Sequence, residues 1–271
     1  MAEQSYDSDT MPFVAPCRDV PFLAPLRWLR LGFADFKRAV PQSLGYGIFM
    51  SATIALVCFL AWRYGSFWFL FAMLGGFIFL APLTCIGLYA ISAQLEREQS
   101  VSLKRAIRAG IKRHLGNELT FAIVLLVVFL VWARAGAMVS IFFPVQAEPD
   151  FRELLTFLGI GTAVGAVFAT ITFSASAFSL PMIMHRKVDA VTAVITSINA
   201  VLRNKLTMMF WLALIVLLVM VGFATAFIGM TVLLPVIGHA AWHGYQETID
   251  ASAFPRHDVG ITAVPRAETA H

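Results

Sequence analysis

The feature that most constrains this chain is a set of long segments without a formal charge. The longest runs from Leu206 to Gln246 and holds 41 residues, if its two histidines are neutral. A helix needs roughly 20 mostly apolar residues to cross a bilayer, so this run is long enough for two spans. Four further uncharged runs qualify or come close: Ser43 to Trp62, Tyr64 to Leu95, Leu119 to Ala133 and Leu154 to Met184.

The composition supports a membrane protein and excludes a water-soluble one. Hydrophobic residues make up 59% of the 271 residues and charged residues only 13%, and the mean hydropathy is +0.78. So few charges could not cover a surface that faces water. We therefore predict an all-α fold, a polytopic transmembrane helical bundle of about six spans, at 43–62, 67–92, 119–139, 157–180, 206–222 and 225–245. No charge marks the turn between the last two, expected at Gly222 to Thr225, so this run could also be one span.

The basic residues predict the orientation. With six spans, 17 of the 20 lysines and arginines fall on one face, and Arg63, Arg134 and Arg152 fall on the other. Because lysine and arginine collect on cytoplasmic loops, both termini should be cytoplasmic. Arg134 should lie near the outer end of its span, where its side chain can reach the headgroups.

Three amphipathic segments precede the three pairs of spans. The first carries the apolar stripe Leu26, Leu29, Phe33, Phe36 and Val40; the second Leu103, Ile107, Ile111 and Leu115; the third Val191, Val194, Ile195, Ile198 and Leu202. Spacings of three and four residues indicate interfacial helices. The basic rows between the stripes are typical either of contact with anionic lipids or of helices that pack on the bundle under the positive-inside rule.

The second span of each pair contains a proline, Pro82, Pro181 or Pro235. These helix-break prolines either open a cavity or are accommodated in packing. The sequence thus predicts three units, each an interfacial helix plus a hairpin. The expected organisation is a flexible cytoplasmic arm at 1–24, a membrane domain at 25–250 and a flexible cytoplasmic tail at 251–271.

The stretch TVLLPVIGHAAWHGYQE holds the residues most suggestive of a site. His239 and His243 are four residues apart and could chelate a metal from one helix face. We weigh three alternatives: an interfacial belt with Trp242 and Tyr245, a protein or lipid contact, and a metal or haem site. His185 follows Pro181 by four residues as His239 follows Pro235, and it joins the possible contact surface. No Cys pair or carboxylate accompanies the histidines at a diagnostic spacing, so no cofactor and no firm metal site are predicted.

The other motifs in the sequence indicate no specific chemical activity. Gly161 and Gly165 stand at GxxxG spacing and predict an internal packing seam. The predicted spans contain no Asp or Glu, and the sequence lacks a nucleotide-binding loop, a nucleophile elbow and a zincin helix. The sequence therefore argues against an enzyme and predicts no catalytic residue.

From LRLGFADFKRAVPQSLGYGIF through the proline hairpins to LLPVIGHAAWHGYQETID, over roughly residues 25 to 250, the chain resembles the bacterial predicted integral membrane proteins of domain of unknown function 2189. The resemblance implies a multi-pass protein of the bacterial inner membrane and carries no established activity. Some relatives bear a label suggesting cytochrome c oxidase subunit I, which about six spans and one histidine pair do not support.

Three hypotheses of function follow. The leading one is a non-catalytic accessory, scaffold or assembly component of the inner membrane. The alternatives are a small-solute or lipid transporter and a haem- or metal-binding membrane protein. The expected partners are the bilayer, with anionic lipids and other membrane proteins, and no nucleic acid.

Overall fold

The computed structural model describes residues 12–64, 85–97, 101, 115–142 and 151–256. Within these ranges the chain is helical and forms no strand; two isolated β-bridges join Cys17 to Ile249 and Arg186 to Arg256. The helices are α1 (Ala24–Arg38), α2 (Val40–Tyr64), α4 (Ile86–Glu96), α6 (Leu115–Phe142), α7 (Phe151–Ser176), α8 (Ser179–His185), α9 (Ala190–Arg203), α10 (Lys205–Ala224) and α11 (Met230–Thr248).

Four segments of the described chain are long and apolar enough to cross a membrane. They are Val40–Leu60, Thr120–Met138, Gly159–His185 and Lys205–Ala224. The all-helical membrane fold is therefore confirmed. Most of the expected second span, 67–92, lies outside the described residues, and α4 forms its last part. Helix α11, expected as the sixth span, is not among these four segments.

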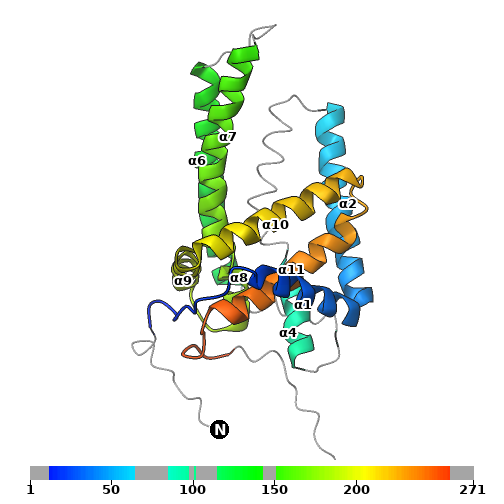
Figure 1. Ribbon diagram of the computed structural model, residues 1–271, viewed down its shortest axis with the longest axis vertical. Coiled ribbons are helices and arrows are strands. Elements are labelled where there is room, and N and C mark those ends of the chain that lie inside the picture. The colour runs from blue at the N-terminus through cyan, green and yellow to red at the C-terminus, as the bar shows by residue number, and fades with distance from the viewer. Residues whose placement is uncertain (1–11, 65–84, 98–100, 102–114, 143–150, 257–271) are drawn as a thin grey trace, which may run out of the picture.

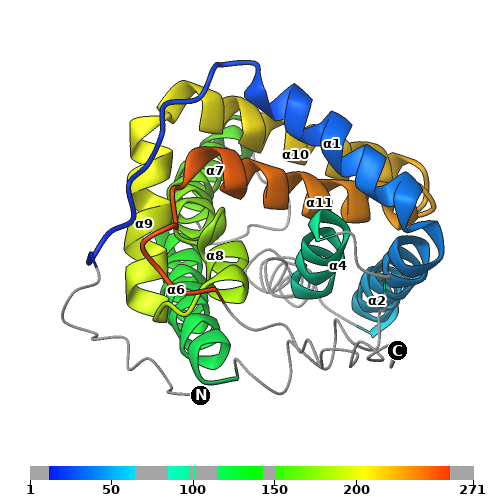
Figure 2. The ribbon, with the colours of Figure 1, turned by 90° about the horizontal axis from the view of Figure 1, so that it is seen from below.

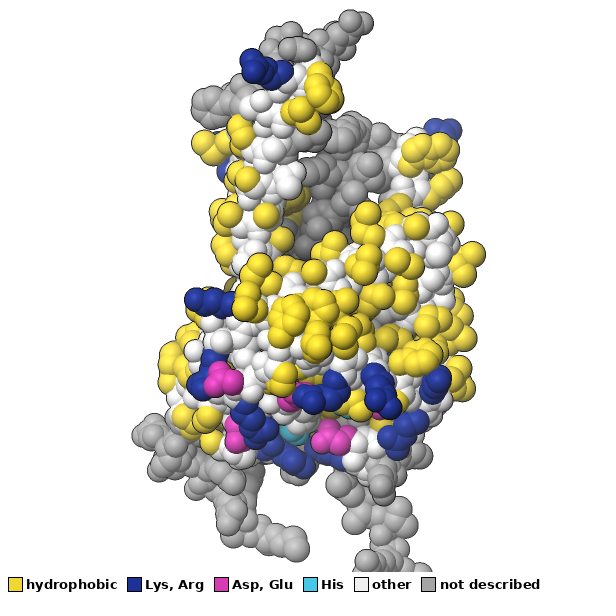
Figure 3. Space-filling view, viewed as in Figure 1, with side chains coloured by type: hydrophobic (Ala, Val, Ile, Leu, Met, Phe, Trp, Pro, Cys, Tyr) yellow, Lys and Arg dark blue, Asp and Glu magenta, His cyan; other side chains and the backbone are white. Residues whose placement is uncertain are grey.

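The long helices define an axis, and the last hairpin lies obliquely to it. Helices α6 and α7 run side by side along this axis, with α2 on the other side of the molecule (Figure 1). Helices α10 and α11 cross obliquely between them, and α1 lies along α11 at one end, as Figure 2 also shows. That end carries a band of charged side chains, above which the surface is largely hydrophobic (Figure 3).

The first interfacial helix forms as expected, but most of its apolar stripe points outward, while Phe36 of the stripe is buried. In α1, Leu26 and Phe33 are 47% and 44% exposed, whereas Trp28, Gly32 and Asp35 are buried. Helix α1 therefore packs on the bundle through a face of small, aromatic and polar residues. The exposed part of the stripe, Leu26, Phe33 and Val40, faces the surroundings, which suits a helix at the edge of a bilayer.

The third interfacial helix, α9, repeats this pattern. Its buried face consists of small residues such as Thr196, Ser197 and Ala200, while Val191 and Leu202 are more than half exposed. Asp189 caps the helix by accepting a hydrogen bond from the backbone N–H of Thr192. The second expected interfacial helix, 103–115, lies almost entirely outside the described residues.

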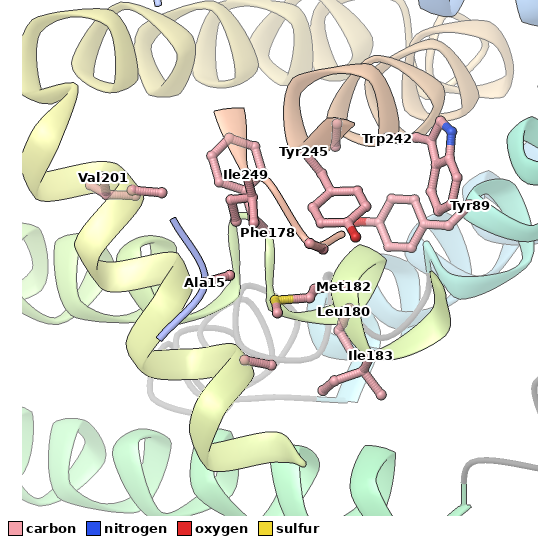
Figure 4. Packing of buried hydrophobic residues seen from close by; sticks show 14 of the residues in the cluster. Ala15, Tyr89, Phe178, Leu180, Met182, Ile183, Val201, Trp242, Tyr245 and Ile249 are labelled. Atoms are coloured by element: carbon pink, nitrogen blue, oxygen red, sulfur yellow. The ribbon is translucent and has the colours of Figure 1, made fainter. Parts of the chain in front are cut away.

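The core lies where α11 meets α1, α8 and α10 (Figure 4). Trp28 of α1 is fully buried, and its ring meets those of Trp211 and Phe178 edge to face, with centroids 5.7 and 6.3 Å apart. Gly244 of α11 leaves room for the Trp28 ring, because a Cβ there would lie 3.0 Å from it. These aromatic contacts tie the first and last helices to the middle of the chain.

Parts of the expected flexible arm and tail are packed. Ala15 is fully buried and Cys17 nearly so, and the backbone N–H of Arg18 donates to the Thr248 carbonyl at 2.7 Å. In the tail, Phe254 is buried. The difference has a simple cause, since apolar residues in both segments cover the same end of the core. The packed part of the described chain thus includes residues on both sides of 25–250.

Two further expectations are corrected. The turn between α10 and α11 occupies residues 225–229 rather than 222–225, because α10 continues to Ala224. Around Gly161 and Gly165, added Cβ atoms would meet open space. Within the described residues these glycines therefore form no packing seam; they lie on a helix face that no other described helix covers.

Candidate functional site

A histidine on α11 forms the centre of a buried polar cluster. His239 is fully buried; its Nε2 lies 2.9 Å from Ser43 Oγ of α2 and its Nδ1 lies 2.7 Å from Ser92 Oγ of α4. Both ring nitrogens are therefore hydrogen bonded, each to a different helix. A buried imidazole needs such partners, since an unsatisfied polar group in an apolar interior is costly.

A carboxylate on α1 completes this cluster. Ser92 Oγ donates to Asp35 Oδ2 at 2.8 Å, and His243 Nε2 lies 2.9 Å from the same oxygen. We call Asp35, Ser43, Ser92, His239 and His243 the histidine network. It joins four helices, α1, α2, α4 and α11, whose residues are distant in sequence.

The directions of these hydrogen bonds assign the state of His239. The single hydroxyl proton of Ser92 goes to Asp35, so Ser92 accepts from a protonated Nδ1 of His239. Nε2 then accepts from the hydroxyl of Ser43. A neutral imidazole fits both contacts, with one ring nitrogen as donor and the other as acceptor.

Burial sets the charges of the network. For His239, burial lowers the pKa to about 4, which keeps the ring neutral at pH 7. For Asp35, burial alone would raise the pKa, but the hydrogen bonds from His243 and Ser92 outweigh it and hold the pKa below its usual value. The network therefore combines a neutral histidine with an ionised carboxylate.

Glycines and a proline bring the helices close enough for these contacts. Pro235 lies inside α11 without ending it, and proline lacks the N–H that would bond the carbonyl of Thr231. Gly47 of α2 packs directly on that carbonyl and on the Pro235 ring. One turn further, a Cβ on Gly32 of α1 would lie 2.6 Å from the backbone of α11.

The three prolines thus differ in their outcomes. Pro235 is accommodated by close packing rather than by an opened helix. Pro181 is the third residue of α8, and the interruption of the helix lies just before it, at Ala177 and Phe178. Pro82 lies outside the described residues.

Further polar contacts surround the network. Trp242 Nε1 donates to Glu96 Oε2 at 3.2 Å, and His185 Nδ1 lies 2.9 Å from the hydroxyl of Tyr245. Trp28 Nε1 donates to a carboxylate oxygen of Glu247 at 3.0 Å. Each contact joins α11 to another helix, so this helix is the centre of the charged end.

The structure brings together all the site residues predicted from the second half of the chain, but it places most of them inside the protein. His185, His239, Trp242 and Tyr245 are buried, and His243 is one-quarter exposed. They contact other helices of the same chain and do not form an exposed surface. The difference arises because α1 lies over the face of α11 that the sequence leaves open to the headgroups.

Sequence reasoning missed Asp35, Ser43 and Ser92. A usable signal exists for Asp35: with Trp28, Gly32 and Ala39 it stands at spacings of four, three and four residues, which places them on one helix face. Small and polar residues on that face, beside a continuous apolar stripe, indicate a helix that packs through its less hydrophobic side. Ser43 and Ser92 stand in apolar runs and have no comparable signal.

The network resembles a nucleophilic triad in composition but differs from one in geometry. The carboxylate of Asp35 reaches His239 only through Ser92, whereas a triad carboxylate bonds the imidazole directly. Ser43, which would be the nucleophile, is fully buried. Among the described residues no group of three or more His, Cys, Asp or Glu side chains could hold a metal ion. What this arrangement can do is hold four helices together.

The fold and the site define a class, an all-helical integral membrane protein with a closed polar network at its charged end. The model of the family described as "Predicted integral membrane protein (DUF2189)" matches residues 70–185, which confirms the resemblance stated from the sequence. The match covers less than half of the chain and a shorter stretch than expected; residues 231–247 lie outside it. No curated protein and no solved structure matches the chain.

Proposed function

We propose that this protein is a non-catalytic accessory or scaffold component of the bacterial inner membrane. One observation carries the proposal: the histidine network is closed, with each of its groups bonded to a neighbouring helix. Groups arranged in this way rigidify a fold. A rigid bundle with a charged end suits a protein that holds other membrane components.

The proposal includes an orientation and a lipid partner. The three-unit arrangement, with both termini on the cytoplasmic side, is supported by the similar burial of α1 and α9. Exposed basic residues lie next to the exposed apolar stripe of α1, namely Arg27, Arg30, Lys37 and Arg38. Such a face suits anionic headgroups at the cytoplasmic leaflet.

The experiment is isolation of the tagged protein at native expression level after cross-linking in intact membranes. The expected result is one or more membrane proteins recovered in fixed proportion. The matched control carries Arg30→Glu, Lys37→Glu and Arg38→Glu on the exposed face of α1. Recovery of the protein alone, under several growth conditions, would contradict the proposal.

A further inference from the structure

The turn between α10 and α11 is apolar and exposed. Ile228, within the turn, is 75% exposed, and Phe223 before it is 38% exposed. From Leu206 to Gln246 the chain carries no Asp, Glu, Lys or Arg. An exposed, uncharged turn with large apolar side chains is unusual for a loop in water and suits contact with hydrocarbon.

The packing of α11 on α2 shows how far this turn reaches. The Thr231 carbonyl, at the start of α11, lies against Gly47. Gly47 is the eighth residue of α2, which begins at Val40 and continues to Tyr64. At about 1.5 Å per residue, roughly 25 Å of α2 extends beyond this contact. The beginning of α11 therefore lies nearer the charged end of α2 than its far end.

The length of the apolar part of α11 agrees with a position of the turn nearer the charged end than the far end of α2. Helix α11 begins at Met230, and His239 of the network is its tenth residue. The intervening rise is about 14 Å, roughly half of the thickness of a bilayer's hydrocarbon core. In Figure 1 the turn stops short of the far ends of α2, α6 and α7. Helix α10, although long enough to cross, runs obliquely in the same view.

The backbone of the turn is suited to a medium without water. Each backbone N–H from Thr225 to Leu233 donates a hydrogen bond within the turn, and that of Gly229 uses the Thr225 hydroxyl. The N–H of Phe227 donates to the Gly222 carbonyl and that of Ala226 to the Phe223 carbonyl, which is the Schellman arrangement that satisfies the end of a helix. Unsatisfied groups in hydrocarbon cost several kcal/mol each, whereas a loop in water needs no such complete pairing.

Two residues with a left-handed backbone conformation make this pairing possible. Ala226 and Phe227 have φ of 50° and 69°, a region that L-residues other than glycine adopt at a cost of about 1 to 2 kcal/mol each. Glycine would adopt these φ values at a lower conformational cost, yet the turn has alanine and phenylalanine at these positions. Pairing of every N–H from Thr225 to Leu233 inside the bilayer offsets this strain.

We propose that α10 and α11 form a re-entrant hairpin. Both of its ends lie at the charged face, and residues 225–229 contact acyl chains inside the bilayer without reaching the opposite surface. This inference is independent of the proposed accessory function and replaces the fifth and sixth spans by a single inserted hairpin.

Cysteine accessibility tests the proposal in the full-length protein. Cys17, Cys58 and Cys85 are replaced by alanine or serine, and Ile228→Cys is introduced. Two controls carry Trp62→Cys, which is 77% exposed at the far end of α2, or Ala253→Cys, which is exposed at the charged end. A membrane-impermeant maleimide is applied to intact cells and to inverted vesicles.

Each control should react from one side only, whereas Ile228→Cys should react from neither side and fully after denaturation. Reaction of Ile228→Cys from the side that labels Trp62→Cys would show a crossing hairpin and overturn the proposal. Reaction from the side that labels Ala253→Cys would place the turn in water and overturn it equally.

A second measurement distinguishes a thiol in hydrocarbon from one that is merely shielded by protein. Nitroxide labels at 228 and at three exposed positions of α2, Phe49, Leu56 and Trp62, are compared in vesicles. The ratio of collisions with oxygen to collisions with a water-soluble nickel chelate reports depth. The collision ratio of the label at 228 should match the ratio at Phe49 or at Leu56, the two positions inside the bilayer. A ratio like that at Trp62 would overturn the proposal.

Discussion

The charged end and the α6–α7 hairpin are stabilised in different ways. At the charged end, α11 contacts α1, α2 and α4 through buried and half-buried hydrogen bonds and through glycine contacts. In α6, only 11% of the apolar stretch within Thr120–Met138 is buried, and Gly161 and Gly165 of α7 face open space. Side-chain identity should therefore decide stability at the charged end, while hydrophobicity alone should suffice for most of the hairpin.

The largest expected effect comes from adding a methyl group at Gly47. The Cβ of Gly47→Ala would meet the backbone carbonyl of Thr231, which cannot move without displacing α11. We expect a loss of more than about 3 kcal/mol, or no folded protein at all. Thermal unfolding in detergent, followed by circular dichroism, measures the change.

The matched control is Gly45→Ala, in the same helix but with open space around the added atom. It should be neutral, or more stable by up to about 1 kcal/mol because of helix propensity. Equal unfolding temperatures for the two variants would contradict the close contact between α2 and α11.

The next effect is expected from removing the network carboxylate. Asp35→Ala leaves Ser92 and His243 without their acceptor, which should cost about 3 kcal/mol. Asp19→Ala is the control, because it breaks an ion pair with Arg203 whose side chains are 73% and 50% exposed. An exposed pair contributes less than about 1 kcal/mol, so comparable losses in the two variants would refute the importance of the network.

A pH dependence of intermediate size should follow from His239. Its pKa is about 4 in the folded protein and about 6.5 when unfolded, so the unfolded chain binds more protons between these values. Stability should therefore fall by about 2 kcal/mol as the pH drops from 7 to 5. Asp35 adds to the loss only at lower pH, below the ordinary range of a carboxylate.

The variant His239→Gln removes this contribution while retaining Asp35 and His243. The unfolding midpoints of the unchanged protein and of His239→Gln, measured at several pH values, give the slope of stability against pH for each. The variant should be less stable at pH 7 and show a flatter dependence. An unchanged slope would mean that His239 is not the titrating group.

The smallest effect is expected in the hairpin. Gly161→Ala and Gly165→Ala add methyl groups in open space, and each should change stability by no more than about 1 kcal/mol, in the stabilising direction. The same unfolding assay applies. A loss as large as that of Gly47→Ala would show that this face is packed against a partner, and the contrast between the two regions would fail.

The sequence predicts the membrane class and the long helices well because both depend on uncharged length. The spacing of the apolar stripes predicts the interfacial helices α1 and α9, but it does not predict whether a stripe faces the bundle or the surroundings. In water an apolar stripe faces the core, whereas at a membrane edge the surroundings also accept it, so Leu26 and Phe33 are exposed.

The site was predicted only in part. The histidine pair is visible as a local motif, but Asp35 and His243 are 208 residues apart, and no spacing rule connects them. The sixth span was expected because the apolar run is long enough for two crossings. Run length does not reveal that Thr231 packs near the beginning of α2.

The packing of the first helix on the last has a consequence for synthesis. At roughly 5 to 20 residues per second, Asp35 is made about 10 to 40 s before His243, which lies 208 residues later. Until then the carboxylate has no histidine partner, and α1 lacks the helix on which Gly32 packs. The network closes only when the last helix arrives, so a chain that lacks α11 holds Asp35 without its histidine partner. Closure of the network therefore distinguishes a finished protein from an unfinished one.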